Sequence, residues 1–371
     1  MDWTRARVLG TVAATCVFVA ATISPALAQT DAATATSAED FGGLEGLIAA
    51  AQEEGILNVI ALPPDWANYG QMIEDFEAKY GIAVESAQPD ASSQEEIDAV
   101  NNLAGTDAAP DVLDLGPTIA LANTDLYAPY QVATWADIPD DLKDPDGLWV
   151  SDYTGFMSIG CDVGRVALPA TVADLLKPEY AGMIALNGNP TQSGAGFNGV
   201  VLAALANGGS ADDIAPGVDF FKQLNDAGNL LPVDPSPATI ASGQTPCVID
   251  WEYTNAAQTS ALEGMIDWQV TIPSDAPPVA SYYIQAINKE APNPAAARLW
   301  QEYLYSPEGQ NTWLKGFARP VLQDKLIADG TIDEEALANL APVSGTPVQL
   351  TQEQIAAAQE YLAANWDIVI E

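Results

Sequence analysis

Two carboxylates separated by a single residue stand out in segment 247–253, which reads Cys-Val-Ile-Asp-Trp-Glu-Tyr. Asp250 and Glu252 alternate there with the aromatic residues Trp251 and Tyr253. A carboxylate pair can act as acid and base in glycoside hydrolysis. Carboxylates beside aromatic rings can also bind a cation, through ion pairing and cation–π attraction. A turn that carries a solvated acid pair is the plain structural alternative, and the rest of the sequence has to decide among the three.

Composition excludes several kinds of chemistry. The chain of 371 residues contains no histidine, so a Ser-His-Asp triad, a Cys-His pair and a His-ligated zinc site are all excluded. Its 51 acidic residues against 12 basic residues give a formal net charge of −39, which makes nucleic acids and anionic membrane surfaces poor partners. No complete phosphate-loop or dinucleotide fingerprint is present, and we expect neither a cofactor nor a bound metal.

The start of the chain has the pattern of a secretory signal peptide. Basic Arg5 and Arg7 precede an apolar run over 8–23, and Ala26 and Ala28 form a small-residue cleavage motif. A membrane anchor is the alternative, but the run is shorter than the roughly 20 apolar residues that span a bilayer. We therefore predict cleavage after Ala28, with signal peptide 1–28, and a periplasmic or secreted protein.

Two cysteines remain after that cleavage, Cys161 and Cys247. Both lie in apolar stretches with strand-like composition. Because exported proteins fold in oxidising compartments, we predict one disulfide between them. Two separate buried thiols are the alternative.

The acid pair lies where a strand is followed by a helix. Apolar, β-rich residues 247–249 precede it, and 254–262 has helical composition. In α/β sheets, ligands bind in the crevice outside the carboxyl ends of the strands. Three more predicted strand ends carry polar, glycine or aromatic side chains, in loops 63–69, 115–118 and 189–198. We expect these loops to face a ligand.

Strand and helix patterns alternate along the rest of the chain, which indicates an α/β fold with parallel strand pairs. The chain is also longer than one hydrophobic core usually holds, so we expect two lobes. We predict helices over 44–54, 92–104, 171–176, 199–206, 212–227, 237–242, 293–305, 307–315 and 352–365, with a further helix that ends before Gly81. We predict strands over 56–62, 82–86, 111–115, 148–153, 156–161, 183–186, 230–233, 247–249, 268–272 and 282–287, with 268–272 crossing back to the first lobe.

Four stretches of the chain resemble the extracellular solute-binding proteins of bacterial ABC importers. They are Ala-Leu-Pro-Pro-Asp-Trp-Ala-Asn-Tyr at 61–69, Leu-Leu-Lys-Pro-Glu-Tyr-Ala-Gly at 175–182, Asn-Pro-Thr-Gln-Ser-Gly at 189–194 and the helical stretch 296–310. The resemblance is to the branch that includes ferric-iron, polyamine, thiamine and 2-aminoethylphosphonate binders. It covers most of the chain, but no single motif in it identifies the ligand.

This resemblance implies a type II periplasmic-binding-protein clamp, in which two α/β lobes joined by two crossing strands enclose the solute in a cleft. Lobe one would comprise 42–153 plus 275–371, lobe two 154–274, and 29–41 would be a flexible leader. Carried onto matching positions, the family's cleft loops imply the ligand-binding residues Asp65, Trp66, Tyr69, Gly116, Thr191, Ser193, Gly194, Asp250, Trp251, Glu252 and Tyr253. The implied partners are a small-molecule solute and an ABC permease in the inner membrane, and the implied state is a monomer without catalytic residues. A sensor protein that presents its loaded form to a membrane receptor is the alternative role.

The residues favour an amine as the solute. Asp250 and Glu252 would pair with an ammonium group, Trp66 and the aromatic pair at 251 and 253 would cover it, and the helix start at 193–194 would hold an anionic end. Polyamines and aminoalkyl phosphonates both fit. Ferric-iron members of the resembled family use two neighbouring tyrosines after the matching strand, where this chain has only Tyr253. A ferric-iron binder and a secreted hydrolase that uses Asp250 and Glu252 remain the alternatives.

Overall fold

A computed structural model of the protein describes residues 31–367. The predicted signal peptide and its cleavage site lie outside the described residues. The predicted leader is described from residue 31 onward, where Ala32–Thr34 and Ala38–Phe41 form short 3-10 helices. The Arg298 guanidinium donates hydrogen bonds to the carbonyl oxygens of Ala33 (3.0 Å) and Ala35 (2.7 Å), which attaches this segment to the body of the protein.

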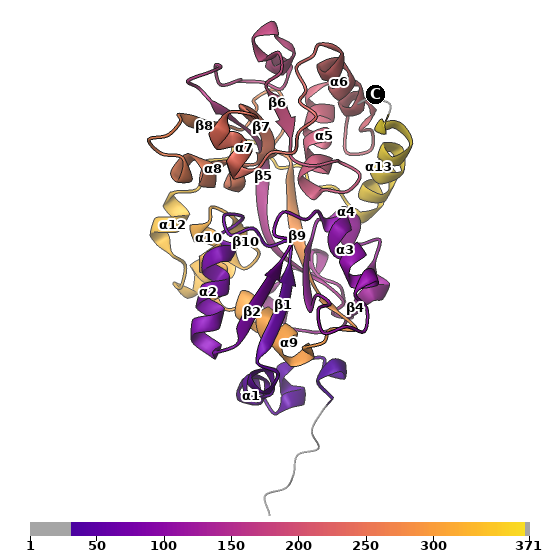
Figure 1. The fold of residues 1–371 in the computed structure, drawn as a ribbon, viewed down its shortest axis with the longest axis vertical. Helices are drawn as coiled ribbons and strands as arrows, with labels where there is room; N and C mark the ends of the chain where they lie inside the picture. The colour runs from indigo at the N-terminus through magenta and orange to yellow at the C-terminus, as the bar shows by residue number, and fades with distance from the viewer. Residues whose placement is uncertain (1–30, 368–371) are drawn as a thin grey trace, which may run out of the picture.

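Helices and strands alternate along most of the chain (Figure 1). The helices are α1 Leu44–Glu54, α2 Tyr69–Tyr80, α3 Ser93–Asn102, α4 Pro117–Ala120, α5 Gly194–Ala206, α6 Ala215–Asp226, α7 Pro237–Ser242, α8 Glu252–Ala261, α9 Pro294–Leu304, α10 Pro307–Lys315, α11 Gln323–Asp329, α12 Glu334–Ala338 and α13 Gln352–Asn365. The strands are β1 Ile56–Ile60, β2 Ala83–Ala87, β3 Val112–Leu115, β4 Tyr127–Ala128, β5 Val150–Asp162, β6 Ile184–Leu186, β7 Cys247–Trp251, β8 Trp268–Thr271, β9 Ala280–Asn288 and β10 Arg319–Pro320.

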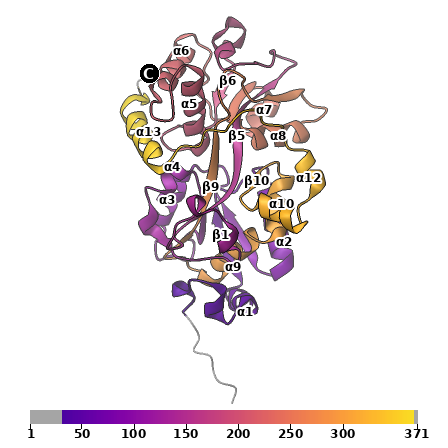
Figure 2. The same cartoon turned by 180° about the vertical axis from the view of Figure 1, so that it is seen from behind.

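The long strand β5 joins two lobes. Its first half pairs antiparallel with β9 and with β10, and its second half pairs antiparallel with β7 and with β8. We call the part built on β1, β2, β3, β4 and β9 lobe one, and the part built on β6, β7 and β8 lobe two. Figures 1 and 2 show β5 and β9 running side by side through the waist between the lobes. The predicted two-lobe α/β architecture is therefore confirmed.

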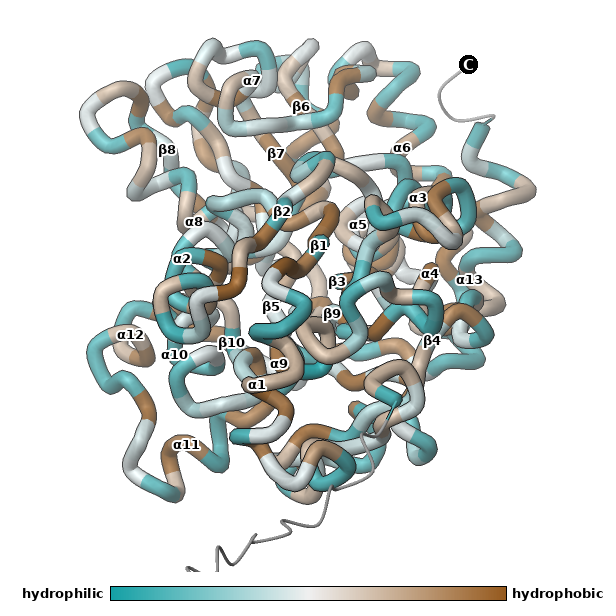
Figure 3. The backbone as a smooth tube through the Cα atoms, turned by 60° about the horizontal axis from the view of Figure 1, so that its bottom comes forward, coloured by the Kyte–Doolittle hydropathy of each residue, from teal (hydrophilic) through white to brown (hydrophobic). Residues whose placement is uncertain are grey.

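Apolar sequence runs account for the strands. Every residue of β5 is buried, and β1 is buried from Leu57 to Ile60, as expected for strands that are covered on both faces. β1 pairs parallel with β2, and β6 pairs parallel with β7. Figure 3 shows apolar segments along the interior strands and polar segments in the outer helices and loops. Within residues 31–367, no helix has both the length and the apolar character required to cross a membrane.

The predicted disulfide is present. Cys161 of β5 and Cys247 of β7 are directly opposite each other in the antiparallel register, with their Cα atoms 4.1 Å apart. Both side chains are fully buried. The disulfide therefore fixes β7, the strand that carries Asp250, to the strand that joins the lobes.

Several predicted elements differ from the structure. The strands predicted at 148–153 and 156–161 are one strand, because Gly155 makes room for a packed ring instead of breaking the strand: a Cβ there would lie 2.4 Å from Cδ1 of Tyr253. Segment 230–233 forms only a single bridge, from Leu230 to Ile184, and the helix predicted at 171–176 is a 3-10 turn. β8, predicted to cross back, pairs with β5 inside lobe two, and β9 returns the chain to lobe one.

Candidate functional site

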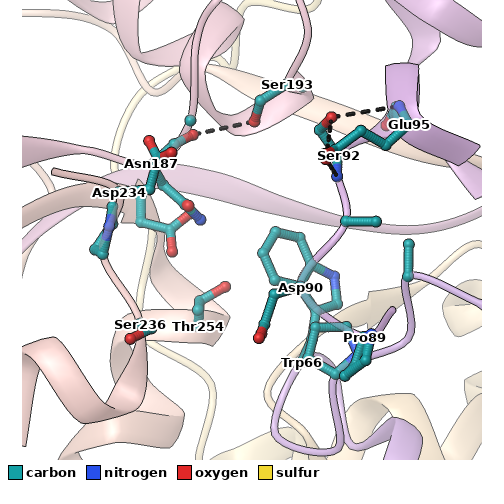
Figure 4. A pocket seen from close by; sticks show the side chains of 18 of the residues that line it. Trp66, Pro89, Asp90, Ser92, Glu95, Asn187, Ser193, Asp234, Ser236 and Thr254 are labelled. Atoms are coloured by element: carbon teal, nitrogen blue, oxygen red, sulfur yellow. Dashed lines mark hydrogen bonds between the residues drawn. The ribbon is translucent and has the colours of Figure 1, made fainter. Parts of the chain in front are cut away.

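A cavity of about 560 Å³ lies between the two lobes. In Figure 4, Trp66, Pro89 and Asp90 come from lobe one, and Asn187 and Asp234 face them from lobe two. The lining is formed by loops at the ends of β1, β2 and β6, by the last residues of β3 and β7, and by the starts of α3, α5 and α8. This placement agrees with the expectation that a ligand site forms outside the strand ends.

Five of the predicted ligand-binding residues line this cavity, namely Asp65, Trp66, Ser193, Gly194 and Asp250. The other six lie outside its lining, namely Tyr69, Gly116, Thr191, Trp251, Glu252 and Tyr253. Strand β7 ends at Trp251 and helix α8 begins at Glu252, so the predicted transition from strand to helix falls within the acid pair itself.

Asp250 lies on the buried floor of the cavity. It is 3% exposed, and its Oδ1 accepts a hydrogen bond of 2.7 Å from the backbone N–H of Trp251. Burial raises the pKa of Asp250 to about 7, and hydrogen bonds from the Asn187 side chain and from that N–H limit the rise. A carboxylate of this kind gains from a positive ligand group, which would offset its desolvation.

Glu252 contacts other groups than Asp250 does. Its carboxylate forms a buried ion pair with Arg319 and accepts a hydrogen bond from the backbone N–H of Phe156. The Arg319 guanidinium also lies 4.8 Å from the centre of the Phe156 ring. Burial raises the pKa of Glu252 to about 7, and Arg319 opposes that rise. The two carboxylates therefore do not face a common reaction site.

An aromatic cluster forms the wall of the cavity next to Asp65. The Trp66 ring makes edge-to-face contacts with Tyr253 and Tyr283, at 5.6 Å between ring centroids in both cases. Its indole Nε1 donates a 2.7 Å hydrogen bond to the hydroxyl of Tyr153. Tyr253 thus packs against Trp66 without lining the cavity itself. Trp66 lines the cavity beside the acidic groups.

Tyr69 and Trp251 are buried supports of the same wall. The Tyr69 hydroxyl accepts a 3.0 Å hydrogen bond from Nε2 of Gln285. The Trp251 indole donates to the hydroxyl of Tyr283 at 3.3 Å and its ring stacks on Tyr253. Because neighbours on a strand point to opposite faces, Tyr283 lines this cavity, whereas Tyr282 lines a different one.

The two lobes touch at the predicted glycine positions. A Cβ on Gly116 of lobe one would lie 2.9 Å from Cα of Gly194 in lobe two, so only glycine allows this approach. Ser193 caps α5 by accepting a hydrogen bond from the N–H of Gly196 (3.3 Å), and its Oγ donates to the carbonyl of Asn187 (3.0 Å). The structure brings Gly116 and Gly194 together as contacts between the lobes.

A second contact between the lobes crosses the cavity itself. Nε2 of Gln258, on α8 of lobe two, donates a 2.9 Å hydrogen bond to Oδ2 of Asp65 in lobe one. Thr191 lies apart from these groups, where its N–H and hydroxyl both donate to Oδ1 of Asn189 (2.9 and 2.8 Å). The conformation described is one in which the lobes lie in contact.

Sequence reasoning missed several residues of the lining. Asp114 lines the cavity near the end of β3, where the sequence predicts a buried strand and places the ligand-facing loop only after it. Asn187 follows β6 directly, and Asp234 lies shortly before α7. The rule that ligands bind at strand ends could have found Asn187. The other polar residues missed are Asp90, Ser92, Ser93, Gln94, Glu95, Glu96, Asp98, Asn189, Gln192, Ser236, Thr254, Asn255, Gln258 and Tyr283.

All charged side chains in the described lining of the cavity are acidic. Its lining includes no lysine or arginine from the described part of the chain. It includes the carboxyl groups of Asp65, Asp90, Glu95, Glu96, Asp98, Asp114, Asp234 and Asp250. Residues 31–367 contain no group of three or more acidic or cysteine side chains arranged to hold a metal ion. The site is therefore chemically suited to a cation that is held by several separated carboxylates and an aromatic face.

Comparison with known proteins agrees with this architecture. A sulfate-binding protein of Salmonella typhimurium is 30% identical over 154 residues, which are 40% of this chain and 45% of that protein, so the match spans less than half of the curated relative. The periplasmic binding protein AfuA from Actinobacillus pleuropneumoniae, solved with exogenous fructose-6-phosphate, is 18% identical with a TM-score of 0.64. That match covers 85% of this chain and 97% of the other.

A ferric binding protein from Campylobacter jejuni is also similar, with 18% identity and a TM-score of 0.60 over 84% of this chain and 99% of the other. At these identities the two structures establish the fold alone. The model of the bacterial extracellular solute-binding proteins matches residues 119–340, which is more than half of the chain. The chain belongs to the family of bacterial extracellular solute-binding proteins.

Proposed function

We propose that this protein is the solute-binding component of an ABC uptake system and that its solute is a small molecule with one or more amine groups. The observation that supports the amine is the lining of the cavity between the lobes, to which residues 31–367 contribute eight carboxyl groups, no lysine or arginine, and the face of Trp66. A desolvated ammonium group gains from such carboxylates, and an aromatic face adds about 0.5 to 2 kcal/mol.

Polyamines fit this lining better than aminoalkyl phosphonates. A phosphonate would need a counter-charge, and in place of a lysine or arginine the described lining offers N–H groups at helix starts, such as that of α5 near Ser193 and Gly194. A zwitterion remains a useful comparison ligand because that helix start lies in the same cavity as Asp250. The ligand-binding residues in this proposal are Asp65, Trp66 and Asp250.

Binding would work by closure of the lobes. Contacts from both lobes to one ligand favour the closed conformation, and the importer's permease would recognise that conformation and take the solute. The hydrogen bond from Gln258 to Asp65 and the approach of Gly116 to Gly194 are contacts of such a closed state. No catalytic step is needed, and the protein would act as a monomer in the periplasm.

The alternatives have less support from the geometry. An oxygen-ligand iron site built from Asp250, Glu252 and Tyr253 would need the three side chains to converge, but only Asp250 lines the cavity. Hydrolysis by the acid pair would need Glu252 free to transfer protons, whereas its carboxylate is held by Arg319 and the N–H of Phe156.

Isothermal titration calorimetry on protein purified without refolding tests the proposal. The ligands would be putrescine, spermidine, 2-aminoethylphosphonate, thiamine and ferric citrate. We expect an amine to bind most tightly. Tight binding of ferric citrate with no binding of any amine would contradict the proposal.

Replacing Asp250 with Asn is the matched test of the site. We expect affinity for the bound amine to fall about 10- to 100-fold, the range of one hydrogen bond to a charged group, because the amide keeps the shape but loses the charge. Asp219→Asn on the exposed face of α6 removes the same charge outside the cavity and is the control. Equal affinity of the Asp250→Asn variant and the control would rule out the role of Asp250.

A further inference from the structure

Asp114 has a carboxylate oxygen without a partner on the floor of the cavity. The residue is the third of β3 and is only 6% exposed. Its Oδ2 accepts a 3.1 Å hydrogen bond from the hydroxyl of Tyr153, but its Oδ1 is buried without any hydrogen bond. A buried acceptor that is left unpaired costs about 1 to 3 kcal/mol, and more when it carries charge. Asp114 is one of the residues that line the cavity.

The surroundings of Asp114 hold it in one position. The hydroxyl of Tyr153 that donates to it also accepts the 2.7 Å hydrogen bond from Nε1 of Trp66, so the carboxylate and the lining indole share one support. The backbone N–H of Asp114 donates to Oε2 of Glu96 at 3.1 Å. The carboxyl group therefore cannot turn away from the cavity without breaking the connection to Trp66.

No positive group of the described protein compensates Asp114. The ionisable and polar groups around it come from α2, α3, β5, β7, α8, β9 and the end of α9. They are Tyr69, Glu96, Asp152, Tyr153, Tyr253, Tyr283 and Tyr305, and Asp250 of β7 interacts with two of these, Tyr253 and Tyr283. Burial raises the pKa of Asp114 to about 6, and the polar side chains of Tyr69, Tyr153 and Asp152 limit the rise. Burial and the Asp114 charge raise the pKa of Asp152 well above its usual range.

We propose that Asp114 is a specificity-determining residue of the cavity, which accepts the ligand's ammonium group on Oδ1 only when its carboxyl group is ionised. This assignment rests on the proposed function, because it requires a cationic solute. Tyr153 is a positioning residue that holds Asp114 ionised and aligned beside Trp66.

The proposal makes amine binding depend on pH. Above about pH 6 Asp114 is ionised and binds the ammonium group directly. Below that pH the ligand must displace the carboxyl proton, which leaves to the buffer, and affinity falls as pH falls. Asp250, with a pKa raised to about 7, contributes a similar dependence, so the test must separate the two groups.

The experiment measures putrescine affinity by calorimetry at pH 7.5 and pH 5.5 for the wild-type chain and for Asp114→Asn, Tyr153→Phe and the control Asp219→Asn. For Asp114→Asn we expect a loss of about 10- to 100-fold at pH 7.5 and a clearly smaller loss at pH 5.5. For Tyr153→Phe we expect the pH midpoint of binding to move upward, because Asp114 loses a hydrogen bond that favours its ionised form. The control should follow the wild type at both pH values.

The outcomes separate the two proposals. If the wild-type chain binds no amine at either pH, the proposed function fails and the assignment of Asp114 fails with it. If the wild-type chain binds putrescine but Asp114→Asn binds equally well at pH 7.5, the assignment alone is overturned. An equal loss at both pH values, with a lowered melting temperature, would show a purely structural role and would overturn it too. Melting curves of all variants accompany the titrations.

Discussion

At the scale of single residues, the acid pair of β7 and α8 separates into two functions. Asp250 lines the cavity, whereas Glu252 is 3% exposed and forms an ion pair with Arg319. The sequence predicts that both carboxylates pair with one ammonium group, because its pattern does not show that the strand ends at Trp251. The helix that begins directly after it turns Glu252 toward the strands that join the lobes.

The Glu252→Gln substitution tests this division. Removing one partner of a buried ion pair leaves Arg319 uncompensated, so we expect the free energy of unfolding to fall by about 3 kcal/mol in denaturant titrations. Amine affinity should change less than about threefold. The control is Asp226→Asn, which breaks the exposed pair with Lys222 on α6 and should cost about 1 kcal/mol or less. A variant with unchanged stability and strongly weakened amine binding would place Glu252 in the site after all.

Residue types explain which parts of the site were predictable. Asp65 and Trp66 follow an apolar strand, so the strand-end rule selects them. Asp114 was missed because it lies within the short β3, where neighbouring apolar residues indicate core. A buried polar group that is not paired within the protein is visible only once the tertiary contacts are known, and Asp114 Oδ1 is such a group.

At the scale of elements, the sequence predicted bounds best where capping residues mark them. The bounds of α1, α7 and α13 agree with the prediction, and Gly55, Gly243 and Thr351 are their cap residues. α5 begins five residues before its prediction, because Ser193 caps it and the small residues after Ser193 are helical. The short helices α11 and α12 were not predicted, since their length gives little periodicity.

The contact between α4 and α5 gives a prediction about closure. Gly116 precedes α4 and Gly194 begins α5, and a methyl group on Gly116 would meet Gly194 backbone atoms at 2.9 and 3.2 Å. We expect Gly116→Ala to favour the open conformation, with about tenfold weaker amine binding and a larger radius of gyration of the liganded protein in X-ray scattering. Gly164→Ala is the control, because its methyl group would meet only Oδ1 of Asp162, inside lobe two. Unchanged affinity and radius for Gly116→Ala would show that this contact does not limit closure.

At the scale of the whole molecule, buried carboxyl groups and net charge act together. The formal net charge of −39 disfavours the compact state by self-repulsion. Burial raises the pKa of Asp111 and Asp114 to about 6, and that of Asp250 to about 7. Both effects make the solute-free protein less stable as carboxyl groups ionise. A bound cation would reduce this cost only at the groups that line the cavity, Asp114 and Asp250.

The predicted result is an unusual dependence of stability on pH. Unfolded carboxyl groups titrate near pH 4, so between about pH 4 and pH 7 the folded protein binds more protons than the unfolded chain, and stability falls as pH rises. A rise of two pKa units corresponds to about 3 kcal/mol, and we expect the free energy of unfolding to be larger at pH 5 than at pH 8 by at least that amount. The measurement is urea unfolding in 1 M NaCl, which screens the exposed charges. The Asp250→Asn variant should show a smaller difference in the free energy of unfolding between the two pH values, and Asp219→Asn should show the wild-type difference.

Greater stability at pH 8 than at pH 5 would mean that the buried carboxyl groups are compensated within the solute-free protein. That result would contradict a cavity whose carboxyl groups are compensated by a cationic solute.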